Sequence, residues 1–311
     1  MVTLKEYGDY ETAWCPGCGN FSILKAVKQA LVACRLRPQD VIFISGIGQA
    51  AKAPHYLNVN LFDGLHGRSL PVATGIKLSN PRKTVIVESG DGCNYGEGGN
   101  HFLAALRRNL DITLLVHDNQ VYGLTKGQAS PTSETGFVTK AQPGGVASSP
   151  FNPVAVAVAM RGGFVARAFS GMVDHLAVII QEAIAHRGFS LVDILQPCVS
   201  FNRINTFSWY KSRCRELPPD YDPSNWEAAM KTAEEWCPAG LRISLPGPQR
   251  GTAGGKRGGP GIAGENLGEL PMIGKTSVRK GRDPERRPIN IVYPCSSGYH
   301  ISLLSLSLLR I

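Results

Sequence analysis

Two polar residues follow apolar runs at positions from which they could bind one metal ion. Asp91 stands in a Gly-Asp-Gly tripeptide after the β-branched run 84–87, and Asn119 follows a second apolar run, 112–116. Both runs are predicted to be buried strands, with a helix over about 98–109 between them. Mg2+ prefers oxygen ligands, waters and substrate phosphates over an all-protein cage. Since ligands of open parallel sheets bind at the carboxyl ends of the strands, the pattern predicts a divalent ion held against a diphosphate.

A Gly-Asp-Gly tripeptide alone more often marks an ordinary turn, and an Asn after a strand an ordinary loop. Here NQVYGLTKGQ follows at 119–128, in the right topological place, and for that reason we favour the metal site. The glycines add to the argument, because a residue without a Cβ lets the backbone approach a ligand closely.

Cysteines form a second chemical pattern. Cys15 and Cys18 lie in Cys-Pro-Gly-Cys, and a turn of this spacing brings two thiolates to one metal or cluster. A redox dithiol and a zinc half-site are the alternatives, although the sequence offers no second Cys-x-x-Cys and no His pair to complete a zinc site. Cys198 follows the apolar run 190–195 and, taken alone, would be a buried thiol.

The rest of the chain to about residue 236 alternates apolar runs with helical periodicity. Further strands are predicted at 41–45, 164–169 and 190–195, and helices at 21–33, 70–78, 153–161 and 173–185. The segment 129–152 is rich in Ser, Thr, Pro and Gly and is predicted to be an ordered excursion or lid. This alternation predicts one α/β domain over residues 1–236, a mostly parallel, twisted sheet with helices on both faces.

With these motifs the chain resembles the beta subunit of 2-oxoacid:ferredoxin oxidoreductases, the family that includes the pyruvate enzymes. Asn119, 28 residues after Asp91, completes a sequence similar to the thiamine diphosphate and Mg2+ motif. Other stretches similar to the family are WCPGCGN at 14–20, SGIG at 45–48, PHY at 54–56, GLHGR at 64–68 and QPC at 196–198. The resemblance covers about residues 10 to 236, in order.

The resemblance implies a fold, a reaction and a set of site residues. The fold is a thiamine diphosphate-binding domain of the pyrophosphate type, and the reaction is oxidative decarboxylation of a 2-oxoacid with coenzyme A to acyl-CoA and CO2, with electrons passed to ferredoxin. Mg2+ would be held by Asp91, Asn119 and the Val121 carbonyl. The cofactor would contact Ile47, Gly48, Gln49, Ala50, His66, Gly90, Asp91, Gly92, Asn119, Val121, Gly123 and Leu124, whereas Lys52 and Arg68 are weaker candidates for the substrate carboxylate or coenzyme A.

Within this resemblance, Cys15, Cys18 and Cys198 would ligate a [4Fe–4S] cluster that takes electrons one at a time. The chain departs from the family at Gln49, where many relatives have a third cluster cysteine directly after Gly-Ile-Gly. An amide is a poor iron ligand. Either Cys93, directly after the Gly-Asp-Gly tripeptide, supplies the missing thiolate from a neighbouring strand end, or the cluster is absent or held by three cysteines.

Thiamine enzymes need a carboxylate that activates the aminopyrimidine ring, and that ring normally lies in a second domain. The chain has room for one such domain, so the resemblance implies an alpha (or alpha–gamma) subunit that carries the activating Glu, and a beta chain that is inactive alone. The alternative function is a subunit of a non-oxidative thiamine diphosphate-dependent decarboxylase or synthase without an iron–sulfur cluster.

The last part of the chain changes character. Residues 237–311 are rich in Gly, Arg, Pro and Ser and hold 11 basic against 4 acidic residues, so most of the net charge of +9 lies there. Such a composition does not bury a core. We interpret this segment as a frame-shifted gene model or a disordered tail, in preference to an RNA-binding extension, and expect no nucleic-acid partner.

The sequence also bears on location. No stretch is long and apolar enough to span a bilayer, and the N-terminal MVTLKEYGDYETAW is too polar for a signal peptide. We therefore expect a cytoplasmic protein without a membrane partner, whose eight cysteines are ligands or buried thiols and not disulfides.

Overall fold

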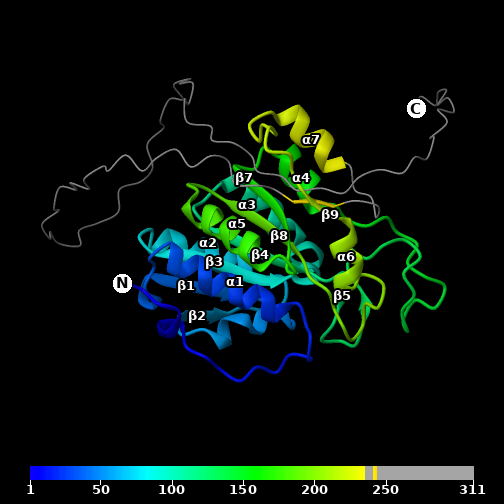
Figure 1. Cartoon of the computed structure of the whole chain (residues 1–311), viewed down its shortest axis with the longest axis horizontal. Coiled ribbons are helices and arrows are strands. Elements are labelled where there is room, and N and C mark those ends of the chain that lie inside the picture. Colours follow the sequence, from blue (N-terminus) through cyan, green and yellow to red (C-terminus); the bar gives the residue numbers. More distant parts are fainter. Residues whose placement is uncertain (235–240, 244–311) are drawn as a thin grey trace, which may run out of the picture. The chain divides into compact units, whose positions relative to one another are not determined.

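The computed structural model of the chain describes residues 1–234 and 241–243, and its centre is a six-stranded sheet (Figure 1). The strand order is β2-β1-β3-β4-β8-β7, and every pairing in this sheet is parallel. The strands are β1 (Val41–Ser45), β2 (Asn60–Asp63), β3 (Thr84–Gly90), β4 (Thr113–Asp118), β7 (Phe164–Phe169) and β8 (Ser190–Leu195). The predicted α/β class with a mostly parallel sheet is confirmed.

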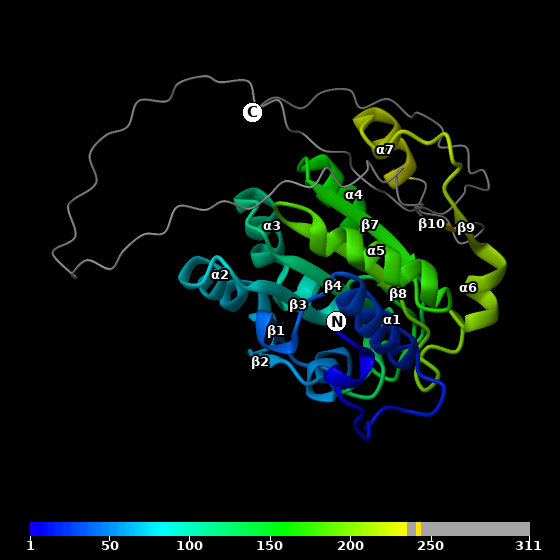
Figure 2. The same cartoon turned by 60° about the vertical axis from the view of Figure 1, so that its left-hand side comes forward.

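Helices cover both faces of the sheet, as predicted (Figure 2). On one face, apolar side chains of α1 (Asn20–Ala33) and α5 (Val173–Ala185) join a buried cluster with strand residues. On the other face, α2 (Ser69–Ser79), α3 (Gly99–Arg108) and α4 (Pro153–Ala159) contribute to a second buried cluster. All five helices lie within two residues of their predicted bounds, because each carries an apolar stripe at helical spacing.

Five of the six strands were also predicted. The differences, two strands that are longer than predicted and one that was missed, have physical reasons. β3 and β4 run further than their apolar cores, because the polar residues Glu88 and His117 are buried and pair with each other. β2 was missed because it is an edge strand with exposed side chains; Phe62, for example, is 49 % exposed. Periodicity marks strands that bury a face, and β2 hardly does so.

Shorter elements complete the described residues. They are the hairpin β5 (Val121–Tyr122) with β6 (Gln128–Ala129), the parallel pair β9 (Cys214–Glu216) with β10 (Leu241–Ile243), the helices α6 (Phe207–Arg213) and α7 (Trp226–Glu234), the 3-10 helices η1 (Leu4–Tyr7), η2 (Pro38–Asp40) and η3 (Ala50–Tyr56), and the π-helical turn η4 (Gly92–Glu97). β10 lies beyond the domain boundary placed at residue 236. The other residues of 237–311 lie outside the described residues, and the division at 236 stays a prediction.

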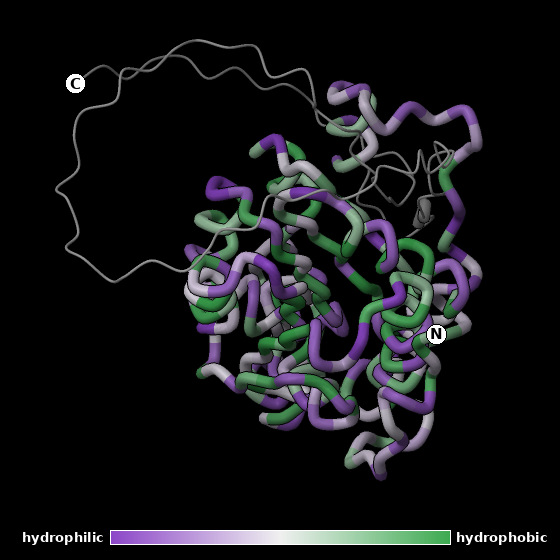
Figure 3. Tube along the Cα trace, turned by 90° about the vertical axis from the view of Figure 1, so that its left-hand side faces the viewer, coloured by the Kyte–Doolittle hydropathy of each residue, from purple (hydrophilic) through white to green (hydrophobic). Residues whose placement is uncertain are grey.

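Hydropathy follows these elements. Figure 3 shows green hydrophobic stretches alternating with purple hydrophilic ones along the chain, as expected for elements with one buried face. None of the helices in the described ranges combines the length and hydropathy that crossing a bilayer requires.

A buried ion pair joins the last two strands of the sheet. Arg167 on β7 and Asp193 on β8 are register neighbours, and both are 0 % exposed. Arg167 Nε donates to Asp193 Oδ2 at 2.8 Å, and the Tyr95 hydroxyl donates to Oδ1 at 2.8 Å. A buried charge without a partner costs several kcal/mol, so this carboxylate depends on the guanidinium beside it.

Replacing Arg167 by Met should lower the free energy of unfolding by about 3–5 kcal/mol, because Asp193 is left buried without its countercharge. Denaturant unfolding of the full chain measures the change. Arg37→Met is the matched control, since Arg37 pairs with Asp40 at the surface and exposed pairs contribute little. An Arg167→Met chain as stable as the control would contradict the prediction.

Candidate functional site

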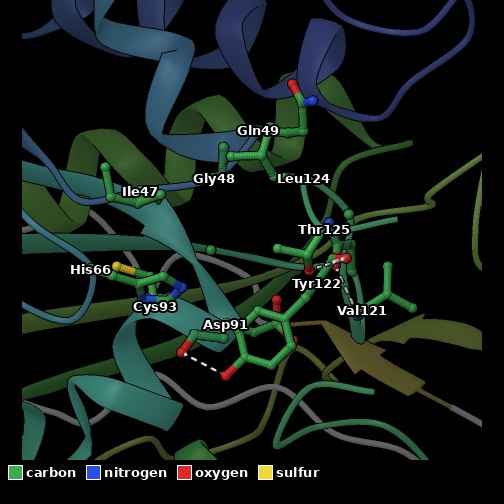
Figure 4. A pocket seen from close by; sticks show the side chains of 15 residues that line it. Ile47, Gly48, Gln49, His66, Asp91, Cys93, Val121, Tyr122, Leu124 and Thr125 are labelled. Atoms are coloured by element: carbon green, nitrogen blue, oxygen red, sulfur yellow. Dashed lines mark hydrogen bonds between the residues drawn. The ribbon is translucent and has the colours of Figure 1, made fainter. Parts of the chain in front are cut away.

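A cleft lies at the carboxyl ends of β1, β3 and β4, and Figure 4 shows the side chains that line it. It is lined by Ile47, Gly48, Gln49, Ala50, His66, Gly90, Asp91, Gly92, Cys93, Asn119, Val121, Tyr122, Gly123, Leu124 and Thr125. Every residue that the sequence predicted for cofactor contact is therefore in this cleft. Tyr122 and Thr125 were not predicted. The parallel order β2-β1-β3-β4 brings the loops after these four strands together, with His66 in the loop after β2. The binding role of each residue stays a prediction.

Asp91 is the buried carboxyl group of the cleft. It is 1 % exposed and stands directly before the π-helical turn η4. Ser130 Oγ and Thr132 Oγ1 donate to its Oδ2 at 2.5 and 2.7 Å, whereas Oδ1 accepts no side-chain hydrogen bond within the described residues. Burial raises the pKa of Asp91 to about 6, although both hydroxyls oppose this effect. The segment 129–152, predicted as an excursion or lid, thus supplies the hydroxyls that orient this carboxyl group.

Thr132 also connects Asp91 to a second buried carboxyl group. Its Oγ1 lies 2.7 Å from Asp118 Oδ1 as well as 2.7 Å from Asp91 Oδ2. One hydroxyl carries one proton, so it donates to only one of the two, and the other contact needs a proton from a carboxyl group. Burial, followed by the charges of Asp193 and Asp91, raises the pKa of Asp118 well above its ordinary value. Because the pKa of Asp91 is raised only to about 6, we assign the shared proton to Asp118.

The turn after β4 is built around Asn119. Its Oδ1 accepts a hydrogen bond from the Val121 N–H at 3.0 Å, which leaves a further lone pair on this oxygen. Gln120 between them has φ +61°, a conformation that non-glycine residues seldom adopt. Ser133 Oγ donates to the Gln120 carbonyl and holds the turn in place. The sequence offered an ordinary loop here only as the alternative to a metal site, and it contained no signal for the positive φ of Gln120.

Two glycines leave room for ligand atoms in the cleft. A Cβ added to Gly48 or Gly123 would meet no atom within 4 Å, although both residues line the cleft. Gly92 differs, because a Cβ there would collide with the Tyr122 ring. Open glycine backbone beside a buried carboxylate and an amide oxygen is a donor set that fits a diphosphate with Mg2+.

His66 lies at the edge of the cleft beside an acid that the sequence did not single out. Its Nδ1 is 3.2 Å from Glu97 Oε2, and the Tyr122 hydroxyl donates to the same oxygen at 3.2 Å. Arg68 does not line the cleft; its Nη1 is 2.8 Å from His101 Nε2 on α3. Lys52 on η3 does not line the cleft either.

Three of the four proposed cluster cysteines lie in one region. Cys15 is exposed and Cys18 and Cys198 are half-buried. Burial raises the pKa of Cys18 to about 11, and the nearby Cys198 and Cys15 add to this effect. The Gly19 N–H donates to the Pro197 carbonyl at 3.3 Å, which ties the Cys-x-x-Cys loop to the loop of Cys198. In the described part of the chain, no three His, Cys, Asp or Glu side chains stand close enough to hold a metal as they are.

Cys93 lies elsewhere. Its Sγ accepts a hydrogen bond from the Gly67 N–H at 3.2 Å, and a Cβ on Gly46 would collide with this sulfur. Among the described residues, no contact links the Cys93 thiol to the other three thiols. Gln49, in contrast, is connected to the cysteine loop. Its carbonyl accepts a hydrogen bond at 2.8 Å from Nε1 of Trp14, the residue before Cys15. In Figure 4 its side chain points away from Asp91, and its Oε1 is buried without a hydrogen bond among the described residues.

A buried network links the cysteine loop to the sheet. His117 lies 2.8 Å from Asn20 Oδ1 through Nδ1 and 2.9 Å from Glu88 Oε1 through Nε2, and all three residues are at most 1 % exposed. Asn20 begins α1 two residues after Cys18. The network therefore fixes the cysteine loop relative to β3 and β4. The sequence signal that could have revealed this network is the pair Glu88 and His117, two polar residues at the ends of apolar strands.

Comparisons with known proteins show which families the chain resembles. Residues 44–194 match the family described as "Thiamine pyrophosphate enzyme, C-terminal TPP binding domain". Residues 198–241 match the family of the carboxyl-terminal part of the pyruvate ferredoxin oxidoreductase beta chain, so the similarity extends to the first residue of β10.

Two similar proteins and one solved structure match this chain over most of its length. The chain is 49 % identical to "2-oxoacid:ferredoxin oxidoreductase 1, subunit beta" of Aeropyrum pernix over 75 % of this chain and 76 % of that protein. It is 48 % identical to the "2-oxoacid:ferredoxin oxidoreductase subunit beta" of Saccharolobus solfataricus, over 71 % and 72 %. A solved structure, the 2-oxoglutarate:ferredoxin oxidoreductase from Magnetococcus marinus with 2-oxoglutarate, coenzyme A and succinyl-CoA bound, matches with a TM-score of 0.75 and 34 % identity, over 79 % of this chain and 87 % of that one.

Asp118→Asn should remove a pH dependence of stability. Because the pKa of Asp118 is raised above the ordinary 3.8, the folded chain binds an extra proton, and its stability falls as the pH rises above about 4. The unfolding free energy of Asp118→Asn relative to the unsubstituted chain should therefore increase with pH, as urea titrations from acid to neutral pH would measure.

Asp40→Asn serves as the control with the opposite sign. The hydrogen bond from Arg37 lowers the pKa of Asp40, so the natural residue adds stability above about pH 4 that is lost at lower pH. Parallel pH profiles for Asp118→Asn and the unsubstituted chain would show that Asp118 is ionised in the folded state.

Proposed function

The chain belongs to the family of 2-oxoacid:ferredoxin oxidoreductase beta subunits, and from this premise we propose that it binds thiamine diphosphate in the cleft and serves the CoA-dependent oxidative decarboxylation of a 2-oxoacid. The observation that supports this most is the convergence of Asp91, Asn119 and the open glycines on one cleft. Acyl-CoA and CO2 would be the products, with electrons passed to ferredoxin.

Each group of the cleft has a proposed task. Asp91 Oδ1, Asn119 Oδ1 and the Val121 carbonyl would hold Mg2+ on the diphosphate, while Ser130 and Thr132 keep Asp91 in position. Gly48 and Gly123 would let the backbone lie against the cofactor. Thiamine diphosphate, once bound, supplies the electron sink that decarboxylation requires, and the protein supplies binding and orientation.

The size of the cleft supports a partner subunit. Its free volume is about 70 Å³, below the ~300–1,000 Å³ of pockets that enclose a whole ligand. This chain would therefore hold the diphosphate end, and an alpha subunit would hold the rest and carry the activating Glu. Turnover by the beta chain alone would refute this division of tasks.

The three gathered thiols would hold an iron–sulfur cluster. We assign Cys15, Cys18 and Cys198 as its protein ligands, because their loops are tied together. Cys93, whose thiol lies against Gly46 and Gly67, is not assigned to it. Ser200 and Gln196 donate hydrogen bonds to Cys15 and Cys18 at 3.1 and 3.3 Å, and such bonds would stabilise their thiolates.

One residue favours a second candidate. Gln49 stands where the family resemblance implies a cluster cysteine, so a non-oxidative thiamine diphosphate-dependent decarboxylase or synthase without iron is the alternative function. The iron content of the purified complex distinguishes the two.

Thiamine diphosphate and Mg2+ should stabilise the complex of this chain with its alpha subunit against thermal unfolding. Asp91→Asn should abolish this stabilisation. A ligand at about 100 times its dissociation constant stabilises by about 2.7 kcal/mol, and a neutral amide would lose the metal that links protein to diphosphate. Thermal unfolding with and without cofactor measures the effect. Asp220→Asn, an exposed site, is the matched control; full cofactor stabilisation in Asp91→Asn would refute the proposed metal ligand.

Cys18→Ser should lose iron and acid-labile sulfide from the anaerobically purified complex, whereas Cys93→Ser should retain both. Metal analysis and the visible spectrum measure this directly.

Gln49→Cys should make the bound cluster more resistant to oxygen, because it adds the fourth thiolate. Equal iron loss in Cys93→Ser and Cys18→Ser would return Cys93 to the ligand set, and absence of iron from the unsubstituted complex would favour the non-oxidative alternative.

A further inference from the structure

A second cavity lies outside the cofactor cleft, between the N-terminal segment and α1. Its volume is about 510 Å³, and its lining includes Leu4, Lys5, Phe21, Lys25 and Lys28. Figures 1 and 2 show the N-terminal segment, in dark blue, running beside α1. Lys28 connects this segment to α1, because its Nζ donates a hydrogen bond to the Gly8 carbonyl at 2.7 Å. Nothing in the chemistry of the cofactor cleft uses this cavity.

The cavity combines exposed apolar side chains with positive charge. Leu4 is 50 % exposed and Phe21 41 % exposed, so both present apolar surface at this cavity. Lys5 and Lys25 are exposed and have no ion-pair partner among the described residues. Asp9 is the acid in the lining, so the lysines outnumber it.

The cavity adjoins the cysteine loop. The Phe21 N–H donates to the Cys18 carbonyl at 3.3 Å. The Phe21 ring packs edge-on against Trp14, with 5.5 Å between ring centroids. Trp14 precedes Cys15 and binds the Gln49 carbonyl at the wall of the cofactor cleft. A protein seated on Phe21 would therefore lie next to the exposed turn at Cys15, where the proposed cluster would be.

We propose that this surface, defined by Leu4, Lys5, Phe21 and Lys25, is the docking site of a small acidic one-electron carrier protein, the ferredoxin of the proposed reaction. The inference rests on the proposed function, because it takes the cysteine loop as the point where electrons leave. Lysines around an apolar centre suit such a partner: charge complementarity steers the encounter, and a few apolar contacts suffice for a short-lived electron-transfer complex.

Lys5→Glu/Lys25→Glu tests the surface in the complete enzyme, the chain with its alpha subunit. Its dissociation constant for the oxidised carrier should rise more than about tenfold at low ionic strength, and the salt dependence of binding should largely disappear, because two attractive charges become repulsive. Calorimetric titration with the purified ferredoxin of the same cells measures both. Turnover with methyl viologen, a small cation that needs no docking surface, should remain unchanged.

The matched control is Arg107→Glu/Arg108→Glu, which makes the same change of charge at exposed positions of α3, a helix of the opposite face. It should leave carrier affinity within about twofold, because α3 packs on the face of the sheet opposite to α1 and salt screens charges that are separated by more than a Debye length of about 10 Å. Phe21→Ala should weaken binding without altering the salt dependence, because it removes apolar contact and no charge.

Two results would overturn the docking site. One is carrier affinity in Lys5→Glu/Lys25→Glu equal to that of the control. The other is loss of the alpha subunit from this variant alone, which would make the surface a subunit interface. Because the titration needs no turnover, it decides the docking site even where the enzyme fails to reduce methyl viologen, a failure that would refute the proposed function instead.

Discussion

The described part of the chain buries three carboxyl groups close together and must balance their charge. Asp91, Asp118 and Asp193 are each at most 1 % exposed, and one guanidinium, that of Arg167, is buried with them. Arg167 neutralises Asp193, and Asp118 keeps its proton because burial and its two acidic neighbours raise its pKa. Asp91 is the group that faces the cleft, so it alone has access to a cation from outside. The interior thus leaves one carboxylate available for metal binding.

This balance depends on the order of the strands. Asp193 lies on β8, Asp118 ends β4 and Asp91 follows β3, and these three strands are adjacent in one parallel sheet. Parallel pairing puts all their carboxyl ends at the same edge. The buried network from Asn20 through His117 to Glu88 then attaches the cysteine loop to the same strands. The cleft and the loop of Cys15 and Cys18 are therefore both attached to the same parallel sheet.

The loops contribute more than their composition suggested. The segment 129–152 looked like an excursion or lid because it is rich in small polar residues, yet Ser130, Thr132 and Ser133 are buried and hold Asp91 and the turn after β4. Small hydroxyl residues serve equally in an exposed loop and in a buried one, so composition does not distinguish the two. Glu97 was also missed: it lies at the end of the π-helical turn η4, and its carboxylate accepts a hydrogen bond from the Tyr122 hydroxyl.

The sequence by itself determined the α/β sheet and the bounds of its main helices, because hydrophobic periodicity is a local signal. The Gly-Asp-Gly motif and Asn119 marked the cleft at the ends of two strands, whereas its other lining residues were predicted from the family resemblance. Only the tertiary structure decided which side chains meet. It placed Cys93 against Gly46 and Gly67, joined Asp91 to Asp118 through Thr132, and turned Arg68 toward His101. Such contacts depend on the crossing of loops far apart in the chain and on the space between them, which no local pattern of residues contains.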